Sequence, residues 1–367
     1  MKLHISGAKY SKITGIGEKI RNLEKQTGNE YLYLNQGVNN VCKININNIA
    51  KSIDFDTKDI QVYPTMQGKP ELRDAINKVY FNKKSKIENI LITGGGMSGL
   101  DLTFQTINVN KIYLPVFYWG SYLNIMKIRN ISNDFYDNFD WLNKNLAQLK
   151  NSAVVICDPN NPLGDKFDDN KLLKLIYDLN NNGTVVIVDS PYRRVFYDDN
   201  DDFYKKIHNL ENVIIIESFS KSIGLSGQRI GFVHSTNKNF ISEILIRLMY
   251  ATNGINAFSQ ILVAKILDSD EGKIAAEDFK KTTVKAIKQN IEYLKTKKLI
   301  AEEFFKTSEP KGIFTIVNKS EQELLDKRIG SVSLSFFTKQ KSYKANNYSR
   351  ICVSVPNNKF VEFFSQF

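Results

Sequence analysis

One lysine of this chain stands in a setting that favours chemistry over a place on the surface. Lys221 comes directly after the apolar run NVIIIES (212–218), within SFSKSIGLSGQRIGF (218–232), a segment rich in serine and glycine. A lysine that is held away from water, or placed near other cations, has a lowered pKa, and its neutral amine is a nucleophile. Arg229 lies eight residues further on and could hold an anion in the same pocket through two hydrogen bonds. A solvated role is usual for lysine, but these neighbours favour a reactive one.

Three other segments that could take part in chemistry each follow a short apolar run. TGGGMSGL (93–100) could bind a phosphate through backbone N–H groups at a helix start, although a tight turn also needs glycines. DPNNPLG (158–164) has the composition of a turn. DSPY (189–192) places Asp189 at the end of an apolar run, where a carboxylate needs a cationic partner. A helix cap or a surface ion pair would explain that aspartate equally well.

The pattern between these segments predicts how they are positioned. Short runs rich in β-branched residues alternate with helical stretches such as 170–183, which closes on Gly183. Such alternation predicts a mainly parallel sheet flanked by helices, and ligands bind at the carboxyl ends of strands in sheets of this kind. We therefore expect the four segments to meet at one edge of the sheet. The predicted strands are 88–93, 111–116, 152–158, 184–189 and 212–218.

The two ends of the chain depart from this alternation. A long helical stretch covers 256–296, and short strand-like pieces follow at 312–317 and 349–355. The first forty residues also lie outside the strand–helix pattern, so we predict an α/β protein with a large domain and a small α+β domain built from both termini. The predicted division is 41–254 for the large domain, and 1–40 with 255–367 for the small one.

Composition excludes several classes of function. Lys and Arg exceed Asp and Glu by eleven, but the basic residues are scattered and form no stripe interleaved with aromatics, so we expect no nucleic-acid partner. Apolar stretches reach about five residues, far below the ~20 that span a bilayer, and the N-terminus lacks the apolar core of a signal peptide. The histidines are far apart, so no metal site is expected. Three sparse cysteines without a CxxC motif favour a cytoplasmic location.

Six blocks of sequence, in the same order along the chain, resemble one protein family. They are similar to the class I/II aminotransferases, which are pyridoxal 5'-phosphate (PLP) enzymes with the aspartate-aminotransferase fold, known as fold type I. The resemblance runs from about Leu34 to Val355. The blocks are YPTMQGKPELR (63–73), TGGGMSGL (93–100), DPNNPLG (158–164), DSPY (189–192), SFSKSIGLSGQRIGF (218–232) and YSRICVSV (348–355).

The resemblance implies roles for the residues nearest to the reacting atoms. Lys221 would form a Schiff base with PLP and then move protons between the substrate Cα and the cofactor. Asp189 would pair with the pyridine nitrogen and keep it protonated, so that the ring acts as an electron sink. Asn161 and Tyr192 would hydrogen-bond to the phenolic oxygen, with Asn161 also facing the substrate. Arg350 would bind the α-carboxylate of the substrate through a two-pronged salt bridge.

The resemblance also implies a phosphate site and an aromatic residue on the ring. Phe117 would stack on the cofactor, or Tyr118 or Trp119 in its place if the local register differs. Gly37 would lie against the substrate. The phosphate would be held by Gly95, Gly96, Met97, Ser218 and Arg229, together with Tyr63 from the second subunit of a homodimer.

Several residues depart from the family's usual pattern. Asp158 and Leu163 stand where the family commonly has Asn and Thr, and Asn39 replaces a Pro. Arg193 and Arg194 could face an acidic group of the substrate, although a solvated helix start is the preferred interpretation. These departures weaken any transfer of substrate from the family.

The function that the resemblance implies is a PLP-dependent aminotransferase. It would move an amino group from a small α-amino acid to a 2-oxo acid, with Lys221 as the Schiff-base lysine. The alternative is another reaction at Cα on the same fold: elimination, decarboxylation, or an oxidative or cyclising step in specialised biosynthesis. A third hypothesis is a binding protein that has lost its chemistry, and the presence of Lys221, Asp189, Arg229 and Arg350 argues against it.

Overall fold

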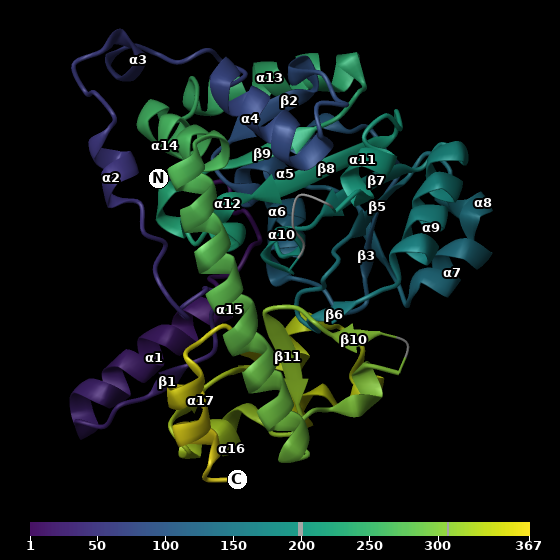
Figure 1. The fold of residues 1–367 in the computed structure, drawn as a ribbon. Coiled ribbons are helices and arrows are strands. Elements are labelled where there is room, and N and C mark those ends of the chain that lie inside the picture. The colour runs from purple at the N-terminus through teal and green to yellow at the C-terminus, as the bar shows by residue number, and fades with distance from the viewer. Residues whose placement is uncertain (197–200, 307) are drawn as a thin grey trace.

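A seven-stranded sheet forms the centre of the large part of the molecule (Figure 1). The computed structural model describes residues 1–196, 201–306 and 308–367. Strand β9 runs antiparallel to both of its neighbours, and the other neighbouring strands are parallel. In spatial order the strands are β2 (Ile90–Thr93), β9 (Gly231–His234), β8 (Val213–Ser218), β7 (Val185–Asp189), β5 (Ala153–Ile156), β3 (Ile112–Pro115) and β4 (Asn133–Tyr136).

The sheet confirms the predicted α/β fold with a mainly parallel sheet. All five predicted strands are present, and their side chains are buried almost throughout, as the unbroken apolar runs indicated. Strands β4 and β9 were not predicted. The sequence of β4, NDFY, is only partly apolar because this strand lies at the edge of the sheet. Strand β9 is a short run that begins inside the segment 218–232, which was interpreted for its reactive lysine.

Helices flank the sheet in two rows, and the helices within each row contact one another. One row contains α4 (Pro70–Phe81), α11 (Phe203–Ile207) and α9 (Asp169–Asn181), and the other contains α13 (Lys238–Thr252), α5 (Gly96–Thr106) and α6 (Gly120–Arg129). Helix α9 corresponds to the predicted helix at 170–183, and the Asp168 side chain accepts a hydrogen bond from the Lys171 N–H at its start.

The chain ends form a second region below the sheet in the view of Figure 1. Its core is a three-stranded antiparallel sheet of β11 (Phe314–Val317), β14 (Ser349–Cys352) and β13 (Val332–Ser333). Strand β1 (Leu32–Tyr33) pairs in parallel with β12 (Ile329–Gly330) beside it. The helices of this region are α1 (Lys12–Thr27), α16 (Glu321–Asp326) and α17 (Asn357–Phe364).

A long helix, α15 (Asp270–Thr296), runs from the main sheet to this second region (Figure 1). The predicted helical stretch at 256–296 is therefore two helices, α14 (Ala257–Asp268) and α15. The break falls at Ser269, whose side chain accepts a hydrogen bond from the Gly272 N–H and caps α15. A Cβ at Gly272 would lie 2.5 Å from the backbone of Ile266, so only glycine allows the two helices to turn this closely.

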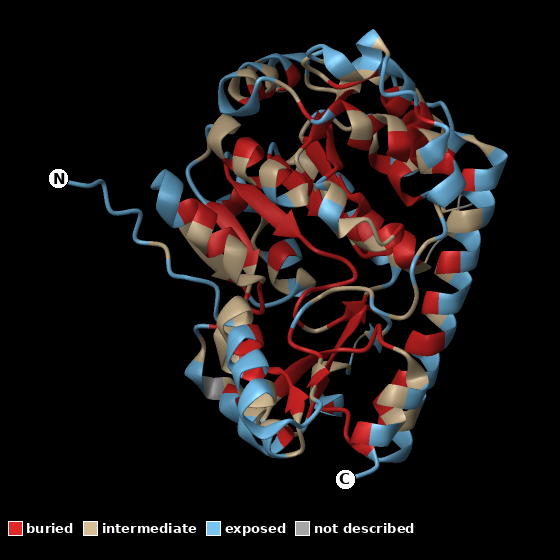
Figure 2. Cartoon of the chain, turned by 90° about the vertical axis from the view of Figure 1, so that its left-hand side faces the viewer, coloured by how far each residue is buried: buried red, intermediate tan, exposed pale blue. Residues whose placement is uncertain are grey.

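The buried apolar side chains form one large cluster and two smaller ones. The large cluster draws on residues between 49 and 267 and surrounds the main sheet, and the smaller ones lie mostly within the chain ends. Figure 2 shows the buried strands inside an exposed outer surface, with the residues before α1 extending away from the body. The division at residue 254 stays a prediction, and α14, which follows that residue, packs in the large cluster.

Across the described ranges, no helix combines the length and the apolar character needed to cross a membrane.

The remaining elements are short. These elements are α2 (Asn47–Lys51), α3 (Lys58–Gln61), α7 (Phe139–Lys144), α8 (Leu146–Leu149), α10 (Arg193–Phe196), α12 (Phe219–Ser222), β6 (Asp165–Lys166), β10 (Glu309–Pro310), and single 3-10 turns at Ile87–Asn89, Ser226–Gln228, Glu302–Phe304, Leu334–Phe337, Lys341–Tyr343 and Ala345–Asn347.

Candidate active site

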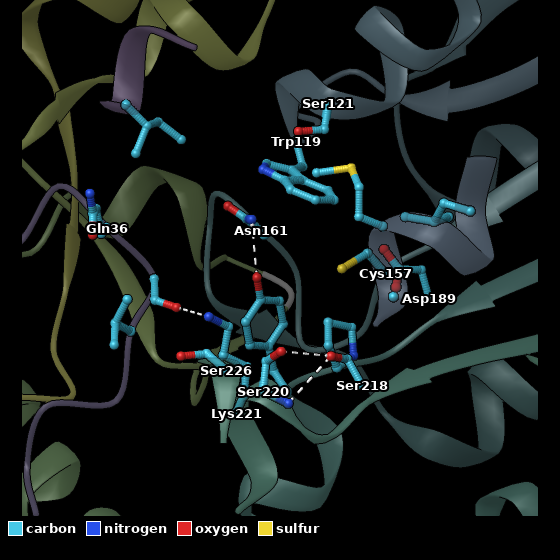
Figure 3. A pocket seen from close by; sticks show the side chains of 18 of the residues that line it. Gln36, Trp119, Ser121, Cys157, Asn161, Asp189, Ser218, Ser220, Lys221 and Ser226 are labelled. Carbon is cyan, nitrogen blue, oxygen red and sulfur yellow. Dashed lines mark hydrogen bonds between the residues drawn. The ribbon is translucent and has the colours of Figure 1, made fainter. Parts of the chain in front are cut away.

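A cavity of about 450 Å³ lies where the central sheet meets the chain ends (Figure 3). Its walls come from the carboxyl ends of β5, β7 and β8, the start of α5, and from α1 and β14 of the second region. The four segments that the sequence placed at one edge of the sheet all reach it. The predicted site residues that line the cavity are Gly37, Gly96, Met97, Asn161, Asp189, Tyr192, Ser218, Lys221, Arg229 and Arg350.

Lys221 projects into this cavity from α12, directly after β8. Its Nζ donates a hydrogen bond to the backbone carbonyl of Gly37. Burial lowers the pKa of this amine to about 8; Cys352 opposes the shift, and the nearby guanidinium groups of Arg229 and Arg350 add to it. At neutral pH the neutral, nucleophilic form of the amine is therefore far more populated than in an exposed lysine.

Asp189 is the last residue of β7 and is buried at the other end of the cavity. Burial raises the pKa of its carboxyl to about 7, while a hydrogen bond from the Tyr122 hydroxyl lowers it. Tyr122 lies on α6 and is fully buried, which raises its own pKa far above the usual value and keeps it a neutral donor. Among the residues that the structure describes, no cation forms an ion pair with Asp189. The carboxylate is therefore suited to a protonated nitrogen from outside the chain.

A chain of hydrogen bonds connects the middle of the cavity to β14. The side-chain amide of Asn161 donates to the Tyr192 hydroxyl at 3.1 Å, and Arg350 donates to the Asn161 side-chain oxygen at 3.0 Å. Arg350 also donates to the backbone carbonyl of Asn35, and its guanidinium lies 4.3 Å from the centre of the Phe314 ring.

Arg350 is a buried cation that lacks an anionic partner. Its Nε has no hydrogen-bond partner, and no carboxylate of the described chain forms a salt bridge with the guanidinium. Burial lowers the pKa of this side chain to about 10, so the guanidinium remains mostly charged at neutral pH. A buried cation of this kind is costly unless an anion joins it, and a carboxylate would fit its fork of donors.

Donors converge at a third corner of the cavity, beside the start of α5. The Arg229 guanidinium donates to the Ser226 carbonyl at 2.8 Å and to the Ser220 hydroxyl at 3.4 Å, and the Ser218 hydroxyl donates to that of Ser220 at 3.0 Å. A Cβ at Gly95, which has a φ of +83°, would lie 2.8 Å from the Arg229 guanidinium. The arginine thus approaches the helix N-terminus closely because Gly95 lacks a side chain. Backbone N–H groups, hydroxyls and a cation in one corner suit a phosphate.

The structure places the predicted aromatic residue elsewhere and so corrects that prediction. The Phe117 ring packs in the core of the second region, 5.5 Å from Phe304 and 4.8 Å from Tyr343, and it does not line the cavity. Of the alternatives, Tyr118 is buried in the large cluster and Trp119 lines the cavity. The three residues lie in the irregular segment between β3 and α6, so local sequence does not determine which side chain faces the site.

Two further predicted residues lie outside the lining. Tyr63 is 81% exposed, and its predicted role needs a second subunit. Gly95 lies directly beside Arg229, which does line the cavity.

Arg193 and Arg194 are buried and do not line the cavity, which corrects the interpretation as a solvated helix start. Arg193 is 0% exposed and forms ion pairs with Asp169 at 2.9 Å and Asp201 at 2.7 Å. Arg194 is also buried and lies over the Tyr80 ring. The carboxylates that pair with Arg193 belong to other parts of the chain, so the residues next to Arg193 in the sequence did not indicate them.

The departure at Asp158 belongs to the same buried network of charges. Its carboxylate pairs with Lys166 at 2.8 Å and accepts a hydrogen bond from the Phe167 N–H. Burial raises the pKa of Asp158, and Lys166 opposes that shift. The aspartate thus stabilises the turn that carries Asn161.

Some lining residues were missed by the reasoning from sequence. Tyr122 comes three residues after Trp119, a spacing that puts both side chains on one face of α6 and could have identified it. Cys157 lines the cavity beside Asp189. The lining residues at the start of α1, and Gln36, carry no local signal because only the fold of the chain ends brings them here. The remaining unpredicted residues of the lining are Ser11, Ile13, Thr14, Val38, Leu100, Ser121, Pro191, Ser220, Ser226 and Phe314.

The chain is similar to known proteins over most of its length. The profile of the family described as aminotransferase class I and II matches residues 27–365. The aspartate aminotransferase of Pyrococcus horikoshii is 27% identical over 275 residues, which cover 69% of this chain and 67% of that protein. The histidinol-phosphate aminotransferase of Buchnera aphidicola subsp. Cinara cedri is 28% identical over 272 residues, covering 72% and 71%.

Solved structures share the fold over the full length. The aspartate aminotransferase of Thermus thermophilus with maleate has a TM-score of 0.84 at 16% identity, covering 100% of both chains. An aminotransferase from Mycobacterium tuberculosis has a TM-score of 0.85 at 16% identity, covering 100% of this chain and 98% of that one. At such identities the likeness shows the fold.

Proposed function

This chain belongs to the class I and II aminotransferases, which use pyridoxal phosphate, and on that premise we propose which reaction it catalyses and with which residues. The proposed reaction moves an amino group from a small α-amino acid to a 2-oxo acid, with PLP held covalently on Lys221. One observation carries the proposal: the cavity holds a lysine of lowered pKa, a carboxylate without a cation and an arginine without an anion. These groups complement an aldehyde, a protonated ring nitrogen and a carboxylate.

The described residues fit the cofactor, and we assign its contacts from their chemistry. Asp189 would hold the ring nitrogen, and Asn161 and Tyr192 the phenolic oxygen. Trp119, rather than Phe117, is assigned to the face of the ring because it lines the cavity. The phosphate would bind at the start of α5, where Gly95, Gly96, Met97, Ser218, Ser220 and Arg229 lie.

PLP, when bound, supplies an electron-withdrawing ring that accepts the electron pair left at Cα when a proton is removed. Lys221 would take that proton on Nζ and pass it to the cofactor, which its lowered pKa permits near neutral pH. The hydrogen bond from the Tyr122 hydroxyl favours the anionic form of Asp189 against the effect of burial. Arg350 holds the substrate's α-carboxylate and keeps it in place, which argues against simple decarboxylation.

A homodimer is part of the same proposal. Tyr63 would reach the phosphate of the other subunit, as its high exposure allows. Val62 and Tyr250 are also exposed, and the segments that carry them are adjacent, because a Cβ at Gly254 would lie 3.4 Å from Pro64. An apolar surface of this kind suits contact with another protein chain. The proposal also retains a cytoplasmic location, which the three free thiols allow.

The absorption spectrum of the holoprotein tests the reaction. Titration with single amino acids, without a 2-oxo acid, should convert the lysine-bound cofactor to pyridoxamine phosphate with at least one of them. Ammonia release without a 2-oxo acid would instead support another reaction at Cα. Cofactor that stays bound after borohydride treatment of Lys221→Ala would contradict the covalent assignment.

A further inference from the structure

Only four charged side chains occur among the described residues that line the cavity: Lys221, Asp189, Arg229 and Arg350. The proposed function assigns each of them to the cofactor or to the substrate's α-carboxylate. The rest of the lining is uncharged, so the side chain of the substrate must be accommodated by neutral groups of this chain.

Three hydrogen bonds place the segment 35–37 and the start of α1 beside Arg350 and Lys221. The Asn35 carbonyl accepts a hydrogen bond from Arg350, and the Asn35 side-chain amide donates to the Ile13 carbonyl at 3.0 Å. The Gly37 carbonyl accepts from Lys221. The segment 35–37 therefore holds the start of α1 next to the two groups that would bind the carboxylate and the amine.

Neutral polar groups lie at this position. Thr14 belongs to the first turn of α1, and Ser11 is the residue that caps the helix. Gln36 is exposed at this side of the cavity, and Figure 3 shows it on the side of Lys221 away from Asp189. Ile13 adds an apolar surface. A hydroxyl or amide can exchange hydrogen bonds with these groups, whereas a charge left without a partner would be costly.

We propose that the start of α1 and Gln36 form the subsite for the substrate's side chain, and that this subsite prefers an uncharged polar side chain to a carboxylate. The proposal rests on the proposed function, which orients the amino acid through Arg350 and Lys221. Gln36 is the residue that determines the preference. One cation outside the lining, Arg21, lies behind Gly17, where a Cβ would be 3.6 Å from its guanidinium and 3.4 Å from the Gln36 amide. The experiments therefore include a variant that removes the charge of Arg21.

Pairs of amino acids that differ in a single charge test this subsite in the holoprotein. The rate of cofactor conversion is measured for asparagine against aspartate and for glutamine against glutamate, without any 2-oxo acid. We expect each amide to react at least about tenfold faster per unit concentration than its acid, because the site leaves the extra carboxylate unpaired. Calorimetric binding of maleamate and maleate, which cannot donate an amino group, should show the same order of affinity.

Variants at Gln36 test whether the preference for an uncharged side chain arises at this residue. Gln36→Arg should lower the ratio of the amide rate to the acid rate by about tenfold. Gln36→Met, which carries no charge, should not raise the rate with the acids relative to the amides. Faster reaction or tighter binding of the acids in the unaltered protein would overturn the inference and leave the aminotransferase proposal standing, and Arg21→Gln would then show whether Arg21 is the cause. An unchanged ratio in Gln36→Arg would also overturn it. If no amino acid at all converts the cofactor, the proposed function fails and this inference fails with it.

Discussion

Two arginines are among the most completely buried large side chains of the molecule, and their surroundings differ. Arg193, beside the turn that carries Asn161, pairs with Asp169 and Asp201. Among the described residues, Arg350 on β14 has neutral partners only, and its Nε has no partner. Removal of one partner of a buried ion pair destabilises a fold, whereas a buried cation that is left unpaired is available for an anion.

The same contrast separates Asp158 from Asp189. Asp158 pairs with Lys166, while Asp189 receives, among the described residues, only the neutral hydroxyl of Tyr122. The cavity therefore holds charges without partners of opposite charge, whereas Asp158 and Arg193 of the neighbouring network have such partners. The following predictions test whether that difference separates function from stability.

Loss of the reactive amine should have the largest effect. Lys221→Ala removes the group that we assign to the covalent bond and to proton transfer, so kcat should fall by at least about 10⁴-fold. Steady-state turnover with the best amino acid measures it. Lys221→Arg keeps the charge without the nucleophile and should be equally inactive; substantial activity in that variant would contradict the assigned role.

Removal of the paired arginine should lower stability. Arg193→Met leaves the buried carboxylate of Asp201 without this partner, while Asp169 keeps its ion pair with Lys166. We expect the free energy of unfolding to fall by about 3–5 kcal/mol. Urea denaturation measures it. Arg247→Met is the matched control, because its ion pair with Glu243 is partly exposed and its loss should cost less than about 1 kcal/mol. Equal stability in the two variants would remove the contrast between the arginines.

Removal of the unpaired arginine should affect catalysis and lower stability less than removal of Arg193. Arg350→Met deprives no carboxylate of the described chain of a partner and leaves only the neutral acceptors of Asn161 and Asn35 unpaired, so stability should fall by about 1–3 kcal/mol at most, less than in Arg193→Met. The value of kcat/KM for the amino acid should fall roughly 100-fold, mostly through KM. Arg350→Lys should recover only part of the loss because an ammonium lacks the two-pronged fork. A stability loss as large as that of Arg193→Met would contradict the assignment.

The smallest effect is expected at Tyr122. Its hydrogen bond lowers the pKa of Asp189, which burial holds at about 7, so Tyr122→Phe should raise that pKa further. The carboxylate form, which pairs with the ring nitrogen, then appears only at higher pH. PLP affinity of the cofactor-free protein should fall about tenfold at pH 7 and recover as the pH rises. Fluorescence titration across pH 6–9 measures it.

Tyr118→Phe is the matched control for that experiment. Its hydroxyl makes no hydrogen bond to Asp189, and its ring packs on Phe135 instead. The variant should therefore leave the midpoint of the pH dependence unchanged. A shift of the same size in both variants would mean that Tyr122 does not act through Asp189.

The cofactor end of the cavity was largely predictable from the sequence. Glycines before a helix, an aspartate that ends an apolar strand and a lysine directly after another strand are local arrangements within a few residues. The parallel sheet then brings such strand ends to one edge. That is why strands β2, β3, β5, β7 and β8 and the position of Lys221 followed from pattern and resemblance.

What the tertiary structure alone decided depends on residues that are distant along the chain. Lys221 donates a hydrogen bond to the carbonyl of Gly37, 184 positions away, and Arg350 donates one to the side chain of Asn161, 189 positions away. Whether Phe117 or Trp119 faces the cavity, and whether Arg193 is solvated or buried, depends on packing against such distant partners. Local sequence by itself determined the elements and the chemistry at their ends, because both follow from short-range periodicity and turns. The substrate end could be assembled only by the fold, since its groups come from the start of α1, the segment 35–37 and β14.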